Sequence, residues 1–498
     1  MLLYEVIITL FVIISHSMGS RNIILIIADD LDIVLDGMTP LNKTATLIGQ
    51  NGKTFTNCFA AVPVCCPNRA SILTGRYQHN HLVVNNSLEG NCNSIQWQNT
   101  FENQTFASYL KQDMNYKTFY AGKYLNQYGD PKAGGLRKPL GWDDWYGLKG
   151  NSKYYNYILS INGNEKKYNQ KPEEYLTDVI KNLATDYIRK WNSVSDSFLM
   201  VLAPPAPHEP FTPALRHNDK YKAIRAKRTP NFNTPVQTNK HWLVRRGPGP
   251  LPDNVLPELD KTYRKRWETL LALDELVEAV YARLKEKNLL SSTYIIFTSD
   301  NGYHIGQFSL PIDKRMPYET DIRVPLLIRG PNILQSEVTS PVSSVDLFAT
   351  ILEIAGINRP SDGTSLLSDN LAIDRTVLIE YKGEKSKVKP ASGCPSDSDP
   401  NLSLCNKNLA CKCLDALNNT YSCIRRMSPN FNNIFCTFED DEQFIEAYDL
   451  ATDNYQLKNI GKIMKSALRH RFRKRLNKIS KCKDKTCVYT GTQPKYHK

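Results

Sequence analysis

The strongest constraint on the fold is an apolar run near the N-terminus that ends in two carboxylates. Residues 22–28 read Asn-Ile-Ile-Leu-Ile-Ile-Ala, and Asp29 and Asp30 follow. A strand that is apolar at nearly every position is buried on both faces, as in parallel sheets covered by helices. The runs at 198–203 and 293–298 have the same character. The sequence therefore predicts several buried, mainly parallel strands.

Helices are expected between these strands. A helix leading into the strand at Thr293 is indicated by apolar residues at steps of three and four: Leu270, Leu273, Val277, Val280 and Leu284. A second helix is expected from Asp346 to Ala355, with Gly356 as its stop. Alternating strands and helices predict an α/β domain, with a mostly parallel central sheet flanked by helices.

The length of 498 residues suggests one large domain with a smaller companion. We expect the large domain at 20–371 and a cysteine-rich α+β domain at 372–498, with strands at 376–381 and 444–450 and a basic helix after them. The stretch from Pro210 to Pro257 is rich in Pro, Asn, Lys and Arg. It is expected to be a long surface excursion near the mouth of the active site.

The N-terminus predicts entry into the secretory pathway. The apolar run from Leu2 to Ile14 is too short to span a bilayer, and Ser17 and Gly19 are small residues suited to a cleavage site. We expect a signal peptide at 1–19 and no transmembrane anchor. Glycosylation sequons begin at Asn42, Asn85, Asn103, Asn401 and Asn418.

The formal net charge of +13 favours polyanionic partners. Nucleic acid and sulfated polysaccharide both qualify, and the predicted compartment favours the polysaccharide. Basic residues are dense between Lys462 and Lys485, where one helical face carries Leu468, Phe472, Leu476 and Ile479. This segment is either a packed helix with a solvated face, or a patch that binds heparan or a membrane surface.

The segment from Cys65 to Arg76 has the features of a short helix whose N-terminus forms part of an active site. Pro67 suits a first helical turn and Gly75 suits a stop. A cysteine at a helix N-terminus faces free N–H groups, and Arg69 adds a fork-shaped cation suited to tetrahedral oxyanions. The alternative is that the Cys65-Cys66 pair serves only in disulfides.

Two acidic pairs predict a cation site. Asp29 and Asp30 follow one predicted strand, and Asp300 and Asn301 follow another. Adjacent carboxylates repel one another unless a cation lies between them, and their oxygens suit Ca²⁺ or Mg²⁺ rather than zinc. The alternative is a pair of solvated turns with helix-capping acids.

These motifs together resemble the sulfatase family across most of residues 21–370. The matching stretches are Cys65–His81, Asn85–Cys92, Ala121–Asn126 and Asp300–Gln307. The resemblance implies an alkaline-phosphatase-like fold, and Cys65 converted to formylglycine by the formylglycine-generating enzyme. It also implies one Ca²⁺ held by the following residues: Asp29, Asp30, Cys65, Asp300 and Asn301.

The resemblance also assigns roles to basic residues. Arg69, Lys123, His208 and Lys314 match catalytic positions, while His79, His81 and His304 are candidates for sugar binding. The histidine usual after the catalytic lysine is absent, since Leu125 and Asn126 stand there, and Asn68 replaces the usual serine of the signature. For each single His or Lys, a solvated or capping role is the alternative.

The 12 cysteines suit disulfides better than zinc, because the spacing Cys411-x-Cys413 does not match zinc pairs. Conversion of Cys65 leaves an odd number, so one thiol stays unpaired, and Cys66 is the candidate. The sequence does not give the connectivity.

The resemblance is strongest to sulfatases that remove 6-O-sulfate from N-acetylglucosamine in heparan or keratan sulfate. We expect an exo-acting enzyme with a sulfated glycosaminoglycan substrate, lysosomal or alternatively secreted, that binds no nucleic acid. An extracellular endosulfatase, an arylsulfatase-like enzyme and a catalytically silent glycan-binding homologue remain alternatives. Phosphatases and phosphodiesterases of this fold are disfavoured, because they present Ser or Thr and often two zinc ions. The sequence does not give the oligomeric state.

Overall fold

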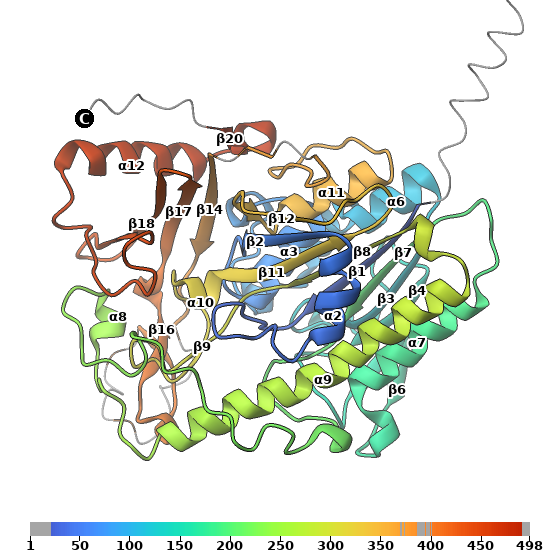
Figure 1. The fold of residues 1–498 in the computed structure, drawn as a ribbon, viewed down its shortest axis with the longest axis horizontal. Helices are drawn as coiled ribbons and strands as arrows, with labels where there is room; N and C mark the ends of the chain where they lie inside the picture. The colour runs from blue at the N-terminus through green and yellow to red at the C-terminus, as the bar shows by residue number, and fades with distance from the viewer. Residues whose placement is uncertain are drawn as a thin grey trace, which may run out of the picture.

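The computed structural model describes residues 21–368, 371–372, 374–385, 394, 399 and 401–490, and is built around one large sheet (Figure 1). Its strand order is β12-β2-β11-β8-β1-β7-β3-β4-β5-β6, with β13 beside β2. Strands β8, β1, β7, β3 and β4 are mutually parallel, whereas β11 runs antiparallel to β8 and β5 antiparallel to β4. The predicted α/β class is thus confirmed. The signal peptide expected at 1–19 lies outside the described residues.

The strands of this sheet are β1 (Asn22–Ala28), β2 (Lys53–Phe59), β3 (Lys117–Lys123), β4 (Asp144–Leu148), β5 (Ile158–Ile161), β6 (Asn164–Lys167), β7 (Phe198–Ala203), β8 (Thr293–Ser299), β11 (Arg323–Arg329), β12 (Ser336–Val338) and β13 (Val342–Ser343). Every residue of β1, β7 and β8 is buried, as their unbroken apolar character predicts. Alternate residues of β1 pack into the two hydrophobic cores on opposite faces of the sheet. Ile24 and Ile26 belong to one core, and Leu25 and Ile27 belong to the other.

Helices cover both faces of the sheet (Figure 1). One core contains residues of α7 (Leu176–Lys190) and α9 (Leu256–Glu286), together with Leu41 and Ile48 at the two ends of α2 (Asn42–Leu47). The other contains residues of α3 (Cys65–Thr74), α6 (Phe106–Met114) and α11 (Asp346–Ile354). Helix α9 begins well before the predicted Leu270, because the buried Leu259, Tyr263 and Trp267 extend the same apolar stripe. Helix α11 stops before Gly356, which has a positive φ of 75°.

A second, antiparallel sheet follows residue 374. Its order is β19-β18-β17-β14-β20. The strands are β14 (Arg375–Tyr381), β17 (Tyr421–Ser428), β18 (Phe431–Phe438), β19 (Ile445–Asp449) and β20 (Tyr489–Thr490), and α12 (Ser466–Ile479) packs on one side. A hairpin of β15 (Leu402–Cys405) and β16 (Cys413–Ala416) carries the disulfide Cys405–Cys413. Both expected strands and the basic helix are present.

The excursion between Pro210 and Pro257 is not simply a surface loop, as the sequence had suggested. It contains only the short η6 (Leu215–His217) and α8 (Trp242–Arg245), yet Lys240 and His241 are buried. Lys240 Nζ donates to Tyr448 Oη at 2.7 Å and lies 3.8 Å from the ring centroid of Phe308. The segment therefore joins the second sheet to the turn that contains Phe308, between the short strands at 304–305 and 312–313. Its basic composition gave no sign of this burial.

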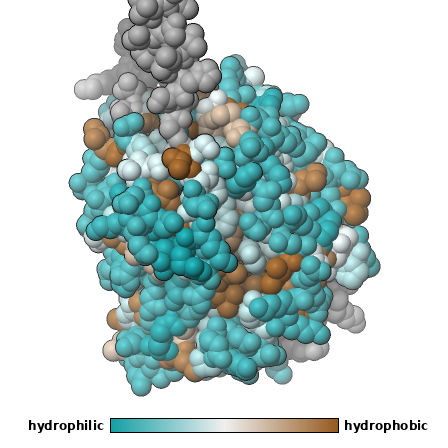
Figure 2. Space-filling model, turned by 90° about the vertical axis from the view of Figure 1, so that its right-hand side faces the viewer, coloured by the Kyte–Doolittle hydropathy of each residue, from teal (hydrophilic) through white to brown (hydrophobic). Residues whose placement is uncertain are grey.

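One face of the molecule is mainly hydrophilic (Figure 2). Figure 2, which shows the right-hand side of Figure 1, has apolar residues in scattered patches. Among the described residues, no helix combines the length and apolar character needed to cross a bilayer. Of the sequons, Asn42 and Asn103 are exposed, whereas Asn85, Asn401 and Asn418 are half-buried.

Lys240→Met tests the role of this buried ammonium group. We expect the free energy of unfolding to fall by about 1–3 kcal/mol, because the Tyr448 hydroxyl and the Gln456 carbonyl lose their donor. Urea unfolding with protease cleavage between Pro210 and Pro257 measures both stability and local opening. Lys220→Met, at an exposed position of the same segment, is the control. An equal change in the free energy of unfolding for Lys240→Met and Lys220→Met would contradict a stabilising role of the buried Lys240.

Candidate active site

The two predicted acidic pairs meet at the carboxyl ends of β1 and β8, where α/β sheets place ligand sites. Ala28 and Ser299 are paired in the parallel register, so the residues after them are neighbours. The backbone N–H of Asp30 donates to Asp300 Oδ1 at 3.0 Å, and Asn301 Nδ2 donates to Asp30 Oδ1 at 2.7 Å. Asp30 is held at a positive φ of 67°, a conformation uncommon outside glycine.

Cys65 lies at the N-terminus of α3 and faces this acidic group. Its Sγ is 3.7 Å from Asp30 Oδ1, and it is one of two cysteines without a disulfide, the other being Cys58. Burial raises the pKa of the Cys65 thiol to about 12, despite the nearby Lys123 and Lys314. The unmodified side chain is therefore a neutral thiol and a poor nucleophile at physiological pH.

Three cationic side chains neutralise the carboxylates. Lys123 Nζ, at the end of β3, lies 2.8 Å from Asp29 Oδ1, and Lys314 Nζ lies 2.6 Å from Asp30 Oδ2. Arg69 Nε donates to Asp300 Oδ2 at 2.7 Å, and its Nη2 is 3.5 Å from Asp29 Oδ1. Three carboxylates and three cations balance formally. Any added divalent cation would therefore make the site an anion receptor.

The carboxylates differ in their proton affinity. Burial alone would raise the pKa of Asp29, but the charges of Lys123 and Arg69 hold it well below its usual range. Lys314 likewise outweighs burial at Asp30 and lowers its pKa. At Asp300 burial prevails over Arg69 and raises the pKa to about 6. The adjacent pair is thus ionised at neutral pH.

His208 lies in the loop after β7 and faces the same centre. Its Nδ1 donates to the Glu209 carbonyl at 2.7 Å, which leaves Nε2 3.7 Å from Asp30 Oδ2. Burial lowers the pKa of His208 to about 4, although Asp29 and Asp30 oppose this shift. Nε2 is therefore the nitrogen available to exchange a proton at the site.

The carboxylate and amide oxygens of the site suit a hard divalent cation. The ligand atoms of Asp29, Asp30, Cys65 and His208 all lie within 4.8 Å of one another, so the structure adds His208 to the predicted group. Asn301 Oδ1 is buried and has no hydrogen-bond partner among the described residues. An orphan amide oxygen beside two ionised carboxylates is the environment that Ca²⁺ or Mg²⁺ satisfies. This is a possible metal-binding site.

Two of the three candidate sugar-binding histidines are hydrogen-bonded within the protein. His79 places Nδ1 2.9 Å from Glu380 and Nε2 2.8 Å from the Cys482 carbonyl. His81 is fully buried, with Nε2 3.0 Å from Ser71 Oγ and Nδ1 accepting from Val83. Both ring nitrogens of His79 and of His81 are thus engaged by protein groups, an arrangement typical of a structural role. Sugar contacts by these two residues stay a prediction.

His304 retains one unused nitrogen. Its Nδ1 lies 3.0 Å from Asp321, while Nε2 is buried without a hydrogen-bond partner in the described part of the chain. His304 belongs to β9 (His304–Ile305), which pairs with β10 (Ile312–Asp313) just before Lys314. A role in sugar binding stays a prediction.

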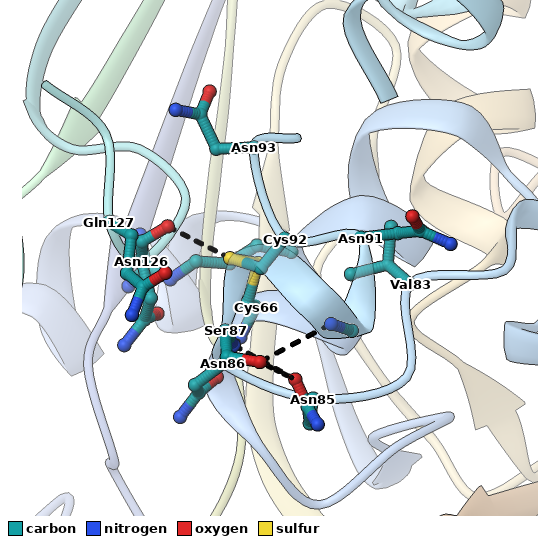
Figure 3. Close-up of a disulfide and its surroundings, with 12 residues drawn as sticks. Cys66, Val83, Asn85, Asn86, Ser87, Asn91, Cys92, Asn93, Asn126 and Gln127 are labelled. Carbon is teal, nitrogen blue, oxygen red and sulfur yellow. Dashed lines mark hydrogen bonds between the residues drawn. A yellow bond between two sulfur atoms is a disulfide. The ribbon is translucent and has the colours of Figure 1, made fainter. Parts of the chain in front are cut away.

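Cys66 is not the unpaired thiol. It forms a disulfide with Cys92, which ties the loop after α4 (Gln78–His81) to the mouth of α3 (Figure 3). The Cys66 N–H also donates to Asn86 Oδ1 at 2.9 Å, so a residue distant in sequence caps the first turn of α3. Apart from Cys65, the cysteine without a disulfide among the described residues is Cys58. Adjacent cysteines gave no signal of which one pairs.

Sequence reasoning missed several supporting residues. Ser152 Oγ donates to Asp29, and Arg266 on α9 donates to the Asp30 carbonyl at 2.8 Å and to Asp32 at 2.9 Å. Asn68, the departure from the family signature, accepts from Ser344 Oγ at 2.7 Å and donates to the Asp300 carbonyl. Neither Ser152 nor Arg266 belongs to a motif. The one signal in the sequence was the position of Arg266, which interrupts the apolar stripe of α9 between Tyr263 and Leu270.

Comparison with known proteins agrees with this geometry. The sulfatase family model matches residues 21–357, and the chain belongs to the sulfatase family. It is 48% identical over 486 residues to N-acetylglucosamine-6-sulfatase from Homo sapiens, covering 95% of this chain and 87% of that protein. The extracellular sulfatase SULF-1 homolog from Drosophila melanogaster is 38% identical over 75% of this chain and 34% of its own length.

Solved structures share the fold. That of BT4656 in complex with its substrate D-glucosamine-2-N,6-O-disulfate has a TM-score of 0.70 at 21% identity and covers 92% of this chain and 97% of its own. A phosphonate monoester hydrolase from Silicibacter pomeroyi has a TM-score of 0.67 at 18% identity, covering 94% and 96%. Because one fold serves both sulfate and phosphonate esters, the chemistry must be argued from the site.

The structural role of His81 predicts a pH effect on stability. Its folded pKa is lowered by burial to about 3 from 6.5, so the unfolded chain binds a proton that the folded chain excludes. This contribution to stability is present above pH 6.5 and is lost towards pH 3, by up to about 1.4 kcal/mol per pH unit. Urea unfolding of His81→Gln should show a correspondingly shallower loss over that range. His470→Gln, at an exposed position, is the control, and parallel curves for wild type and His81→Gln would contradict the assignment.

Proposed function

We propose that this protein hydrolyses the 6-O-sulfate ester of N-acetylglucosamine residues in heparan or keratan sulfate, acting from chain ends. The observation that carries the proposal is the buried, unpaired Cys65 at the mouth of α3, 3.7 Å from Asp30 and surrounded by three cations. The 48% identity to N-acetylglucosamine-6-sulfatase supports the choice of sugar.

Two groups complete the proposed site. Cys65 is converted to formylglycine, and Asp29, Asp30, Asp300, Asn301 and the converted Cys65 hold Ca²⁺, with His208 close by. Formylglycine would supply, as its hydrate, one hydroxyl that displaces the sugar oxygen from sulfur and a second whose deprotonation would re-form the aldehyde and expel sulfate, and the cation would offset charge on oxygen.

The chain's own cations bind the sulfate group. Lys123, Lys314 and Arg69 lie around the acidic pair with their charged atoms within 3.5 Å of a carboxylate. Their charge is held in place before substrate arrives, so the charge that develops on the sulfuryl oxygens meets preorganised partners. Burial of all three strengthens these interactions relative to bulk water.

His208 supplies the proton to the departing sugar oxygen. Its Nδ1 is fixed on the Glu209 carbonyl, so Nε2 is the atom that carries and gives up the proton. Because burial lowers its pKa to about 4, the fraction of the protein with a proton on Nε2 is small at neutral pH and grows as the pH falls. That proton is readily released to an alkoxide. Arg266 donates to the Pro207 carbonyl at 3.3 Å and helps to fix this loop.

Maturation in the secretory pathway is part of the proposal. Five disulfides join Cys66–Cys92, Cys394–Cys411, Cys405–Cys413, Cys423–Cys436 and Cys482–Cys487, which favours an oxidising compartment. The formylglycine-generating enzyme is the expected partner there, with glycans at the exposed Asn42 and Asn103 and the half-buried sequons Asn85, Asn401 and Asn418. We propose a lysosomal destination, with secretion as the alternative.

Cys65→Ala tests the nucleophile. We expect release of sulfate from N-acetylglucosamine 6-sulfate to fall by at least about 10³-fold in kcat, because the reacting group is lost. The matched control is the double change Cys66→Ala with Cys92→Ala, which removes the neighbouring disulfide and should keep measurable activity. Loss confined to the double variant would contradict the assignment of Cys65. A fully matured wild type that binds the sugar without releasing sulfate would instead indicate a silent glycan-binding homologue.

His208→Asn tests the general acid. Turnover of a sugar sulfate should fall by about 10²–10⁴-fold, because the departing alkoxide needs a proton. An aryl sulfate with an acidic phenol as leaving group should lose far less, since that group departs as an anion. Steady-state kinetics on both substrates measure the contrast. Equal losses would assign His208 to binding alone.

A further inference from the structure

The basic helix α12 forms a surface that the proposed chemistry does not use. Its exposed side chains include Arg471, Arg473, Lys474 and Lys478, and exposed Lys481, Lys483 and Lys485 follow. We call these seven residues the α12 ridge. Within the described part of the chain, no ion pair to a carboxylate is formed by Arg471, Arg473 or Lys474.

The opposite side of α12 is firmly packed, so the ridge is held in place. Leu476 and Ile479 are buried, and the ring of Phe472 stacks on Phe435 at 5.3 Å between centroids. The helix of 14 residues is about 21 Å long at 1.5 Å per residue. The expected packed helix is therefore present. Arg471, Lys474 and Lys478, at steps of three and four residues, share its solvent side, with Arg473 at the flank.

The ridge lies on the far side of the second sheet from the active site (Figure 1). Phe435 of β18 pairs with Ile424 of β17, so these residues share the face that meets α12. Tyr421 and Arg425 project from the other face, where Tyr421 Oη donates to the Arg315 carbonyl at 2.9 Å, next to Lys314. A ligand on the ridge is thus not the reacting sugar.

We propose that the α12 ridge binds a sulfated glycosaminoglycan chain at a distance from the active site, as a second contact with the polymer. This inference rests on the proposed function, which supplies a polymeric substrate. Arg and Lys side chains in a row complement repeated sulfates, and Arg forks match their tetrahedral oxygens. A membrane surface is the less suitable occupant, because insertion needs several apolar side chains. The exposed uncharged positions of α12 are Ser466, Ala467, His470 and Asn477, and Ile463 before the helix is the one large apolar side chain exposed between Lys462 and Lys485.

The test is a charge-matched pair of triple variants of the whole matured protein. The ridge variant carries Arg471→Gln, Arg473→Gln and Lys474→Gln, and the control carries Lys171→Gln, Lys190→Gln and Lys285→Gln, all at exposed positions. Binding to a heparin oligosaccharide is measured at several salt concentrations. We expect the ridge variant to bind about tenfold more weakly at low salt. The slope of log affinity against log salt concentration should become shallower by about 2, because three contacts between cationic side chains and sulfate groups are lost. The control should match wild type.

Two further measurements separate the possible outcomes. The rate of hydrolysis of monomeric N-acetylglucosamine 6-sulfate should be the same in both variants as in wild type. If the wild type does not hydrolyse this monomer, the proposed function is refuted, whereas the proposal of glycosaminoglycan binding by the α12 ridge is not. Vesicles containing phosphatidylserine are the competing probe. Equal heparin affinity in the ridge variant and wild type, equal losses in both variants, or ridge-dependent binding to vesicles but not to heparin would each overturn the inference.

Discussion

The buried acidic pair at the end of β1 is the constraint on which the site depends. Two adjacent carboxylates, Asp29 and Asp30, are both essentially inaccessible to water, and each must be compensated by positive charge. Lys123 arrives from β3, Arg69 from α3 and Lys314 from the loop after β10, so three separate parts of the chain converge because of this need. A site assembled in this way is preorganised for an anion as soon as a divalent cation joins it.

The second sheet helps to hold that arrangement. The carbonyl of Arg315, next to Lys314, accepts from Tyr421, and Arg425 bonds Glu319 at 2.9 Å in the following short helix. Lys240 links Phe308 to Tyr448 through the buried part of the 210–257 segment. The C-terminal strands are thus part of the support of the catalytic lysine, and their disulfides stabilise the support.

Local patterns in the sequence predicted the framework and the meeting of the acidic residues, whereas the family resemblance named the basic residues around them. The strands at 22–28, 198–203 and 293–298 were predictable because full burial leaves an unbroken apolar run, and polar residues at their ends converge in any parallel sheet. The pairing of Cys66 with Cys92, the inward-facing roles of His79 and His81, and the contribution of Ser152 were not predictable. They depend on which loops meet in space, and nothing in a residue's type or spacing records that.

The most direct measurement of the central claim is the mass of the peptide containing Cys65 in protein from a eukaryotic secretory host. The account predicts a residue about 18 Da lighter than cysteine, from replacement of the thiol by an aldehyde, with Cys66 found linked to Cys92 in the same map. An unmodified Cys65 thiol, or Cys65 joined in a disulfide in place of Cys66, would contradict it.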